Sequence, residues 1–138
     1  MVSDVCKDWM QSAQRDFIVI DSLLGMIQNP RQRPHEQVLY HCQQAAEKAL
    51  KAFLYNNNQQ PWGHNLVALR TECSKQDSAF NAKRFSDHCA FLQAYNTARY
   101  PDYTDTIDAS VASRGINSAK RVYDFVSERL GLGKTYFK

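Results

Sequence analysis

Three cationic side chains in two separate stretches of the sequence, with an acid beside two of them, could together bind a phosphate group. Glu47, Lys48 and Lys51 lie in a stretch rich in helix-forming residues, and Arg99 lies near the end of a later one. Arginine offers phosphate a two-pronged contact that lysine cannot make. If the two stretches lie side by side, Lys48, Lys51 and Arg99 form a small cationic patch. In the structural alternative, Glu47 and Lys51 form a surface ion pair four residues apart on one helix.

The residues around Arg99 allow a second interpretation of that arginine. Tyr95 lies four residues earlier, on the same helical face, and Tyr100 and Asp102 follow around a proline that turns the chain. A cation is also favoured at the negative end of the helix dipole. Since a half-buried arginine generally needs an acidic partner, a structural clasp would pair Arg99 with Glu47 or Asp102. The clasp and the ligand site both stay open.

Histidines provide the other candidate groups. His64 precedes a predicted short helix and is the first candidate for ligand contact or proton transfer, because imidazole exchanges a proton near neutral pH. A lone histidine is more often structural. The pairs His41–Cys42 and His88–Cys89 suggest metal ligands, but adjacent helical side chains point about 100 degrees apart and do not converge on one ion. We therefore expect neither a metal nor a cofactor.

The C-terminal sequence Gly-Leu-Gly-Lys-Thr at 131–135 partly matches a phosphate-binding loop. A Walker loop needs a further glycine where this chain has Glu128, and it must join a strand to a helix. Our interpretation is a helix that stops at Gly131, followed by a frayed end.

Composition and charge indicate one globular domain. The 138 residues are 43% hydrophobic and 22% charged, which suits a single folded unit over residues 1–138. There is no Cys-x-x-Cys pair, no signal sequence and no apolar run of about 20 residues, so we expect reduced thiols, a cytoplasmic location and no membrane contact. A net charge of +3 does not favour specific binding of DNA.

Apolar residues recur every three or four positions in five segments, which predicts an all-α fold. We expect helices over about residues 4–28, 35–55, 65–74, 78–99 and 106–130. Prolines, an asparagine-rich stretch at 56–58 and Gly131 separate or end them. Because no segment alternates with period two, and short connections favour antiparallel neighbours, the prediction is an up-and-down four-helix bundle with an additional short helix.

A set of local patterns runs along the chain: residues 43–52 (QQAAEKALKA), His64-Asn65-Leu66 with Leu69, residues 95–102 (YNTARYPD), and Trp9, Ala13 and Asp16 near the start. Together they resemble the HEPN domain, a small helical module often encoded beside minimal nucleotidyltransferases in prokaryotes. The resemblance implies a four- or five-helix bundle, commonly a homodimer, with roles in nucleotide binding, in partnering a nucleotidyltransferase or in RNA cleavage.

One departure from the family concerns RNA cleavage. The RNase members carry an arginine followed, after four to six residues, by a histidine. Here three residues separate Arg31 from His35 and Arg84 from His88, and no histidine follows Arg99. A metal-free RNase needs a positioned acid and base, so this departure puts nuclease activity in doubt.

Three functional hypotheses follow. The first is a non-catalytic or weakly catalytic module that binds a nucleotide or RNA phosphate at Lys48, Lys51, Arg99, Tyr95 and His64, with a nucleotidyltransferase as partner in a toxin-antitoxin-like pair. The second is an RNA-cleaving toxin with His64 as base. The third is a subunit that acts through protein interaction alone.

Overall fold

The computed structural model describes residues 2–97, 100 and 107–133. Its helices are α1 (Asp4–Met26), α2 (His35–Asn56), α3 (Leu66–Gln76), α4 (Lys83–Ala94) and α5 (Ala109–Arg129), with 3₁₀ turns at Pro30–Gln32 and Ser78–Asn81. The described ranges contain no strand, which confirms the predicted all-α class. Within the same ranges, each helix is too short or too polar to cross a bilayer.

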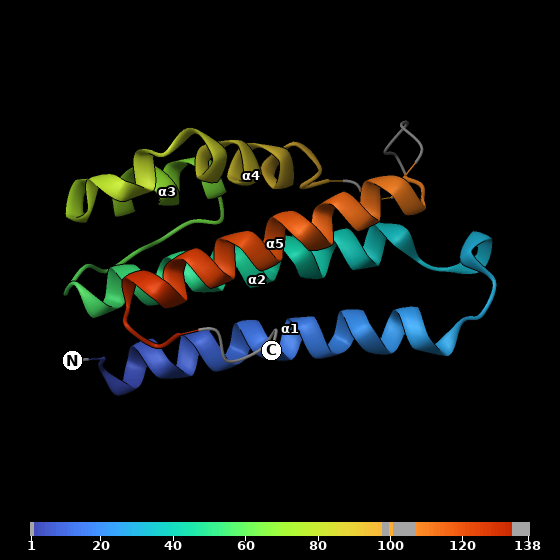
Figure 1. Ribbon diagram of the computed structural model, residues 1–138, viewed down its shortest axis with the longest axis horizontal. Helices are drawn as coiled ribbons and strands as arrows, with labels where there is room; N and C mark the ends of the chain where they lie inside the picture. Colours follow the sequence, from blue (N-terminus) through green and yellow to red (C-terminus); the bar gives the residue numbers. More distant parts are fainter. Residues whose placement is uncertain (1, 98–99, 101–106, 134–138) are drawn as a thin grey trace.

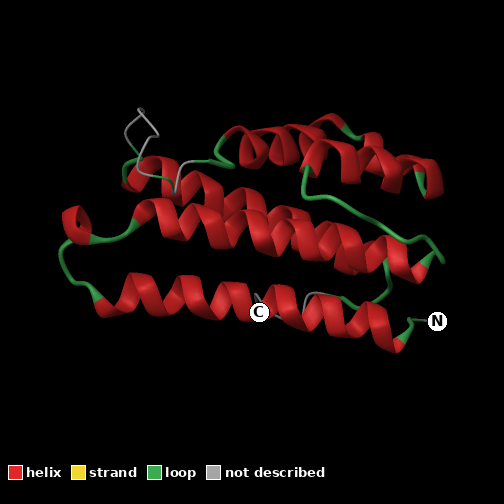
Figure 2. Ribbon diagram, turned by 180° about the vertical axis from the view of Figure 1, so that it is seen from behind, coloured by secondary structure: helices red, strands yellow, loops and turns green. Residues whose placement is uncertain are grey.

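Helices α2 and α5 lie side by side at the centre of the molecule (Figure 1). Helix α1 covers one side of this pair, and α3 and α4 form a hairpin over the other, as the opposite view also shows (Figure 2). Helices α1, α2, α4 and α5 alternate in direction along the chain, which confirms an up-and-down bundle with α3 as the additional short helix. Helix α4, with 12 residues, is nearly as short as α3, with 11. However, α2 and α5 are neighbours that run in the same direction, whereas short connections predict antiparallel neighbours.

A glycine allows the parallel helices α2 and α5 to approach closely. A Cβ added to Gly115 of α5 would lie 2.3 Å from Cδ2 of Leu39 and 3.8 Å from Sγ of Cys42, both on α2. Leu39 and Cys42 are themselves buried. The contact therefore needs a residue without a side chain at position 115.

Aromatic rings pack together near the C-terminal ends of α2 and α5. The ring of Phe80, in the second 3₁₀ turn, lies 4.5 Å from Phe53 of α2, 5.3 Å from Phe85 of α4 and 5.1 Å from Phe125 of α5, measured between centroids. Phe53, Phe80 and Phe85 are buried. Phe80 thus packs against rings from three helices, α2, α4 and α5, at the point where the chain turns from α3 to α4.

The fourth predicted helix, 78–99, is wrong at both ends. The Asp77 side chain accepts a hydrogen bond from the Ala79 amide and starts a 3₁₀ turn, and α4 begins only after Ala82, whose ψ of 134° is not helical. Helix α4 then ends at Ala94. The amides of Tyr95 and Asn96 donate hydrogen bonds to carbonyls three residues earlier, which is the pattern of a 3₁₀ turn at a helix end. The other predicted helix limits agree with the structure to within three residues.

Local capping interactions account for several of the helix ends. Side chains of Ser3 and Asn65 accept hydrogen bonds from the amides of Cys6 and Ala68 at the starts of α1 and α3. Gly131 has a φ of +76°, and its amide bonds to the carbonyl of Glu128 after the end of α5. This confirms the predicted helix stop at Gly131. Lys134 and Thr135 lie outside the described residues.

Candidate functional site

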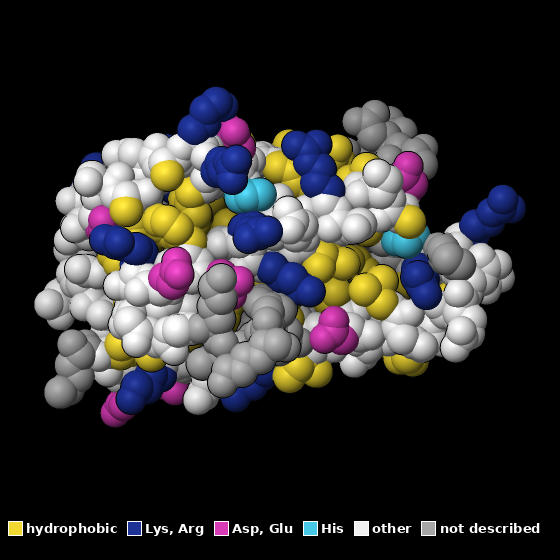
Figure 3. Space-filling model, viewed as in Figure 1, with side chains coloured by type: hydrophobic (Ala, Val, Ile, Leu, Met, Phe, Trp, Pro, Cys, Tyr) yellow, Lys and Arg dark blue, Asp and Glu magenta, His cyan; other side chains and the backbone are white. Residues whose placement is uncertain are grey.

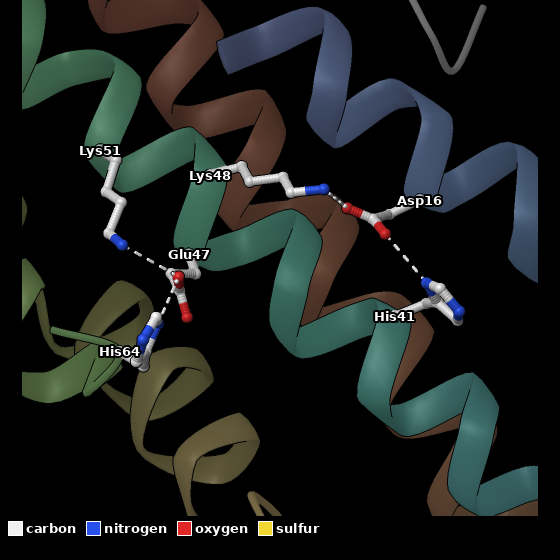
Figure 4. A network of polar contacts seen from close by, with 6 residues as sticks. All are labelled: Asp16, His41, Glu47, Lys48, Lys51 and His64. Carbon is white, nitrogen blue, oxygen red and sulfur yellow. Dashed lines mark hydrogen bonds and ion pairs between the residues drawn. The ribbon is translucent and has the colours of Figure 1, made fainter.

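A buried carboxylate of α2 joins two of the predicted site residues. Oε2 of Glu47 lies 3.1 Å from Nζ of Lys51, one turn later on the same helix, and 3.0 Å from Nδ1 of His64 in the loop before α3 (Figure 4). We call these three residues the Glu47 cluster. Glu47 and Lys51 are buried, whereas the His64 side chain is 82% exposed. The predicted pair of Glu47 and Lys51 is therefore present, but it is buried rather than a surface pair.

The Glu47 cluster fixes the orientation of the His64 ring. An ionised carboxylate only accepts hydrogen bonds. Nδ1 of His64 therefore carries a hydrogen and donates a hydrogen bond to Glu47. In the neutral ring this leaves Nε2 as an acceptor on an exposed side chain. The other oxygen of Glu47, Oε1, is buried and has no hydrogen-bond partner among the described residues.

Lys51 is also in contact with an aromatic pair. Its ammonium nitrogen lies 5.6 Å from the ring centroid of Trp9 on α1, and Trp9 stacks on Tyr55 of α2 with 5.6 Å between centroids. A cation over an indole face is stabilised by the ring quadrupole. Lys51 therefore lies between a carboxylate and an aromatic face, and its side chain is 10% exposed.

Lys48 binds a different carboxylate. Its Nζ lies 2.8 Å from Oδ2 of Asp16 on α1, and Oδ1 of Asp16 lies 2.9 Å from Nδ1 of His41 (Figure 4). The two lysines are three residues apart on α2, yet they bind carboxylates of different helices. The charge of each lysine is balanced by its own acid, so the structure does not bring Lys48 and Lys51 together as one unpaired cationic patch.

The remaining predicted site residues lie at and beyond the end of α4. Arg99 and Asp102 lie outside the described residues, so the structure describes neither the proposed clasp nor the approach of Arg99 to α2. The Tyr95 ring lies 5.1 Å from that of Phe91, and Tyr100 is exposed.

A pocket opens beside the exposed His64. It has a volume of about 390 Å³ and lies between the loop that leads to α3 and α3 itself, with Leu54, Trp62, His64 and Leu69 among its lining residues. Trp62 is 89% exposed. The His64 imidazole and the exposed Trp62 indole thus lie at the same pocket. The imidazole suits a polar group of a ligand, and the indole suits a flat ring.

Asp16 and His41 belong to a polar cluster that is not among the sites predicted from the sequence. A signal was available for Asp16, because it lies next to Phe17 and three residues after Ala13, both on the apolar face of α1. A carboxylate on a buried face needs charged or hydrogen-bonding partners. No comparable signal identifies His41, whose role depends on how α1 and α2 pack. Among the described residues, no three histidine, cysteine, aspartate or glutamate side chains are grouped to hold a metal ion.

Comparison with known proteins agrees with the helical architecture. No curated protein matches the sequence. Among solved structures, the chain is similar to the crystal structure of TT1696 from Thermus thermophilus, with a TM-score of 0.78 and 21% sequence identity over 92% of this chain and 99% of that one. At this identity the likeness concerns the fold alone. A comparison with protein families matches the HEPN domain over residues 6–130, nearly the whole sequence. The chain therefore belongs to the HEPN family.

Proposed function

We propose that this HEPN protein is a binding module for the phosphate group of a nucleotide or RNA, and that the Glu47 cluster is its site. The observation that carries the proposal is His64, an exposed ring whose Nδ1 is held by the buried Glu47 at 3.0 Å. Holding one ring nitrogen leaves the other to contact a ligand. Membership of the HEPN family supports the same conclusion.

Neighbouring groups supply further contacts for such a ligand. A lysine ammonium has three donors, and among the described residues the Lys51 ammonium makes one hydrogen bond, to Glu47. The exposed Trp62 offers a surface on which a base could stack, an interaction worth about 1–3 kcal/mol per base. The proposal assigns Arg99 and Tyr95 to the same site, as additional cation and aromatic group, whereas Lys48 is held by Asp16.

Calorimetric titration with nucleoside mono-, di- and triphosphates and with short single-stranded RNA tests this proposal. His64→Ala and Trp62→Ala are suitable variants, because both side chains are exposed and their loss should not unfold the bundle. We expect each to weaken binding at least tenfold, and the exposed Lys7→Ala of α1 to bind as the unmodified protein does. The proposal is wrong if no nucleotide or RNA binds, or if both variants bind normally.

The pairing of Glu47 with His64 also supports a second candidate function, RNA cleavage with His64 as base. A carboxylate that orients an imidazole by its Nδ1 proton leaves Nε2 free to take a proton from a reacting hydroxyl. Incubation with RNA, beside His64→Ala and Glu47→Gln, distinguishes the two functions. Cleavage that both variants abolish supports the nuclease, and binding without cleavage supports the module.

The family also motivates a proposal about association. We infer that the chain forms a homodimer and acts with a minimal nucleotidyltransferase, in a toxin-antitoxin-like pair. Light scattering of the purified chain measures its mass in solution. Co-expression with any short nucleotidyltransferase encoded beside the gene for this chain, followed by co-purification, tests the pairing. A monomer that captures no such enzyme would contradict this part while leaving ligand binding unaffected.

A further inference from the structure

A second pocket lies between α4 and α5, away from the loop that carries His64. It has a volume of about 570 Å³ and is lined by Arg84 and His88 of α4 and by Asn117, Arg121, Asp124 and Glu128 of α5, among others. We call it the α4–α5 pocket. In the space-filling view, lysine and arginine side chains gather around a histidine over these two helices (Figure 3).

Antiparallel packing of α4 and α5 holds the pocket walls in place. The rings of Phe85 and Phe125 lie 4.3 Å apart between centroids. In the middle of the contact, Nδ1 of His88 lies 2.9 Å from Oγ of the buried Ser118. This hydrogen bond fixes the His88 ring on α4 against α5, and it leaves Nε2 for another partner.

Positive charge is in excess around His88. Arg84 and Arg121 are exposed, and neither makes a hydrogen bond or ion pair with other described residues. Asp87, the nearby acid on α4, is already paired with Lys83, with 3.1 Å between Nζ and Oδ2. The two arginines are therefore available to an anion from solution.

The ionisation of His88 agrees with this excess. Burial lowers the pKa of His88, and Arg121 lowers it further, with smaller contributions in the same direction from Arg114 and Arg84 against an opposing one from Asp87. A positive field disfavours a further positive charge. The three arginines lie close enough to His88 to act on its ring, although they belong to two different helices.

Carboxylates limit the positive part of the α4–α5 pocket. Three acids line the pocket as well: Asp124 and Glu128, one and two turns beyond Arg121 on α5, and Asp87 of α4, which is paired with Lys83. A polyanion that filled the whole volume would meet these acids. A single phosphate group beside His88 would instead contact Arg84 and Arg121, the two arginines that line the pocket.

We propose that the α4–α5 pocket binds one phosphate group, with Arg84 and Arg121 as its charged donors and His88 as a third. The phosphate can belong to inorganic phosphate, to a nucleoside monophosphate or to an RNA strand. This site shares no residue with the Glu47 cluster, so the test of phosphate binding here does not depend on the proposed function. Phosphate favours the protonated imidazole, so binding raises the pKa of His88.

Nuclear magnetic resonance of the His88 ring tests the proposal, with His88→Gln to assign its signals. Inorganic phosphate, a nucleoside monophosphate, and an RNA oligonucleotide with and without a 5′-phosphate are titrated separately. We expect at least the inorganic or the terminal phosphate to shift the His88 signals and to raise its pKa. The two oligonucleotides distinguish a terminal phosphate from the phosphodiester backbone.

Arg84→Gln and Arg121→Gln should each weaken this binding at least tenfold. The matched control, Arg15→Gln, removes an exposed arginine of α1 and should change binding less than twofold, as should His64→Ala. Removing either pocket arginine should also raise the pKa of His88 without any ligand, because it removes a neighbouring positive charge. Unshifted His88 signals in all four titrations, or normal binding by both arginine variants, would overturn the proposal.

Discussion

Glu47 and His64 are joined by a hydrogen bond between a buried carboxylate and an exposed ring, and the same carboxylate oxygen accepts a hydrogen bond from the ammonium of Lys51. The i, i+4 pair that the sequence predicts is thus one part of a three-residue cluster. Its members come from the middle of α2 and from the loop that precedes α3. This arrangement fixes His64 without burying it, and that combination makes His64 the centre of the proposed ligand site.

The buried Asp16 should contribute strongly to stability. Asp16→Asn removes the negative charge that Lys48 and His41 share, and leaves a lysine beside an uncharged amide. Hydrogen bonds to charged groups contribute about 1.5–3 kcal/mol, so we expect a loss of about 2 kcal/mol in the free energy of unfolding. Urea denaturation measures it. The control is Asp8→Asn, an exposed acid on the same helix, which should change stability by less than about 0.5 kcal/mol. Equal effects of the two substitutions would show that Asp16 has no structural role.

Gly115→Ala should destabilise the bundle although alanine is the better helix former. The new methyl group would overlap Cδ2 of Leu39, which lies 2.3 Å from the position of the added Cβ. Overpacking costs about 1–3 kcal/mol and the gain in helix propensity is about 1 kcal/mol, so a net loss of about 1 kcal/mol is expected.

A double-mutant cycle with Leu39→Ala isolates this contact. Leu39→Ala alone should cost about 2–5 kcal/mol, but in that background Gly115→Ala should be neutral or stabilising, because the obstructing methyl group is gone. Additive free energies of unfolding would contradict the close approach of α2 and α5 at this position.

The cysteine thiols should be unreactive in the folded protein. All four are buried and free of disulfide bonds. Burial raises the pKa of Cys6 to about 11 and those of Cys42 and Cys89 to about 12, and it raises the pKa of Cys73 as well. The thiolate is the reactive form, so Ellman's reagent at pH 8 should detect no fast-reacting thiol in the native protein and all four after denaturation in guanidinium. One fast thiol in the native state would disprove this.

The lowered pKa of His88 predicts a loss of stability as the solution is acidified. Burial and the three neighbouring arginines keep the native pKa below the ordinary 6.5, so as pH falls below 6.5 the unfolded chain takes up a proton before the folded one does. The free energy of unfolding should therefore fall with pH from 6.5 to the native pKa, and this contribution should be constant below it. His88→Gln should remove this part of the dependence, as urea denaturation at pH 7.5 and 5.5 can show. Identical pH dependences of the two proteins would contradict the shift.

Much of the fold could be predicted from the sequence, because the ends of a helix depend on residues within one turn of them. The periodic apolar residues and the stop at Gly131 are local features that the structure confirms, and the caps that it shows at Ser3 and Asn65 are local as well. The end of α4 was not readable in this way. The prediction extended the helix to Arg99 because Pro101 must stop it, but α4 ends at Ala94, before the weak helix formers Tyr95, Asn96 and Thr97.

Sequence alone also identified Glu47, Lys51 and His64 as candidate groups, but tertiary structure decided their partners. Lys48 and Lys51 have the same chemistry and nearly the same position. One binds an acid 32 residues away and the other binds an acid one turn away, because the helix directs their side chains toward different neighbours. The arginines and histidine of the α4–α5 pocket likewise come together only when α4 packs on α5. Local sequence sets which helices form, while the register and direction of their packing set which charges meet.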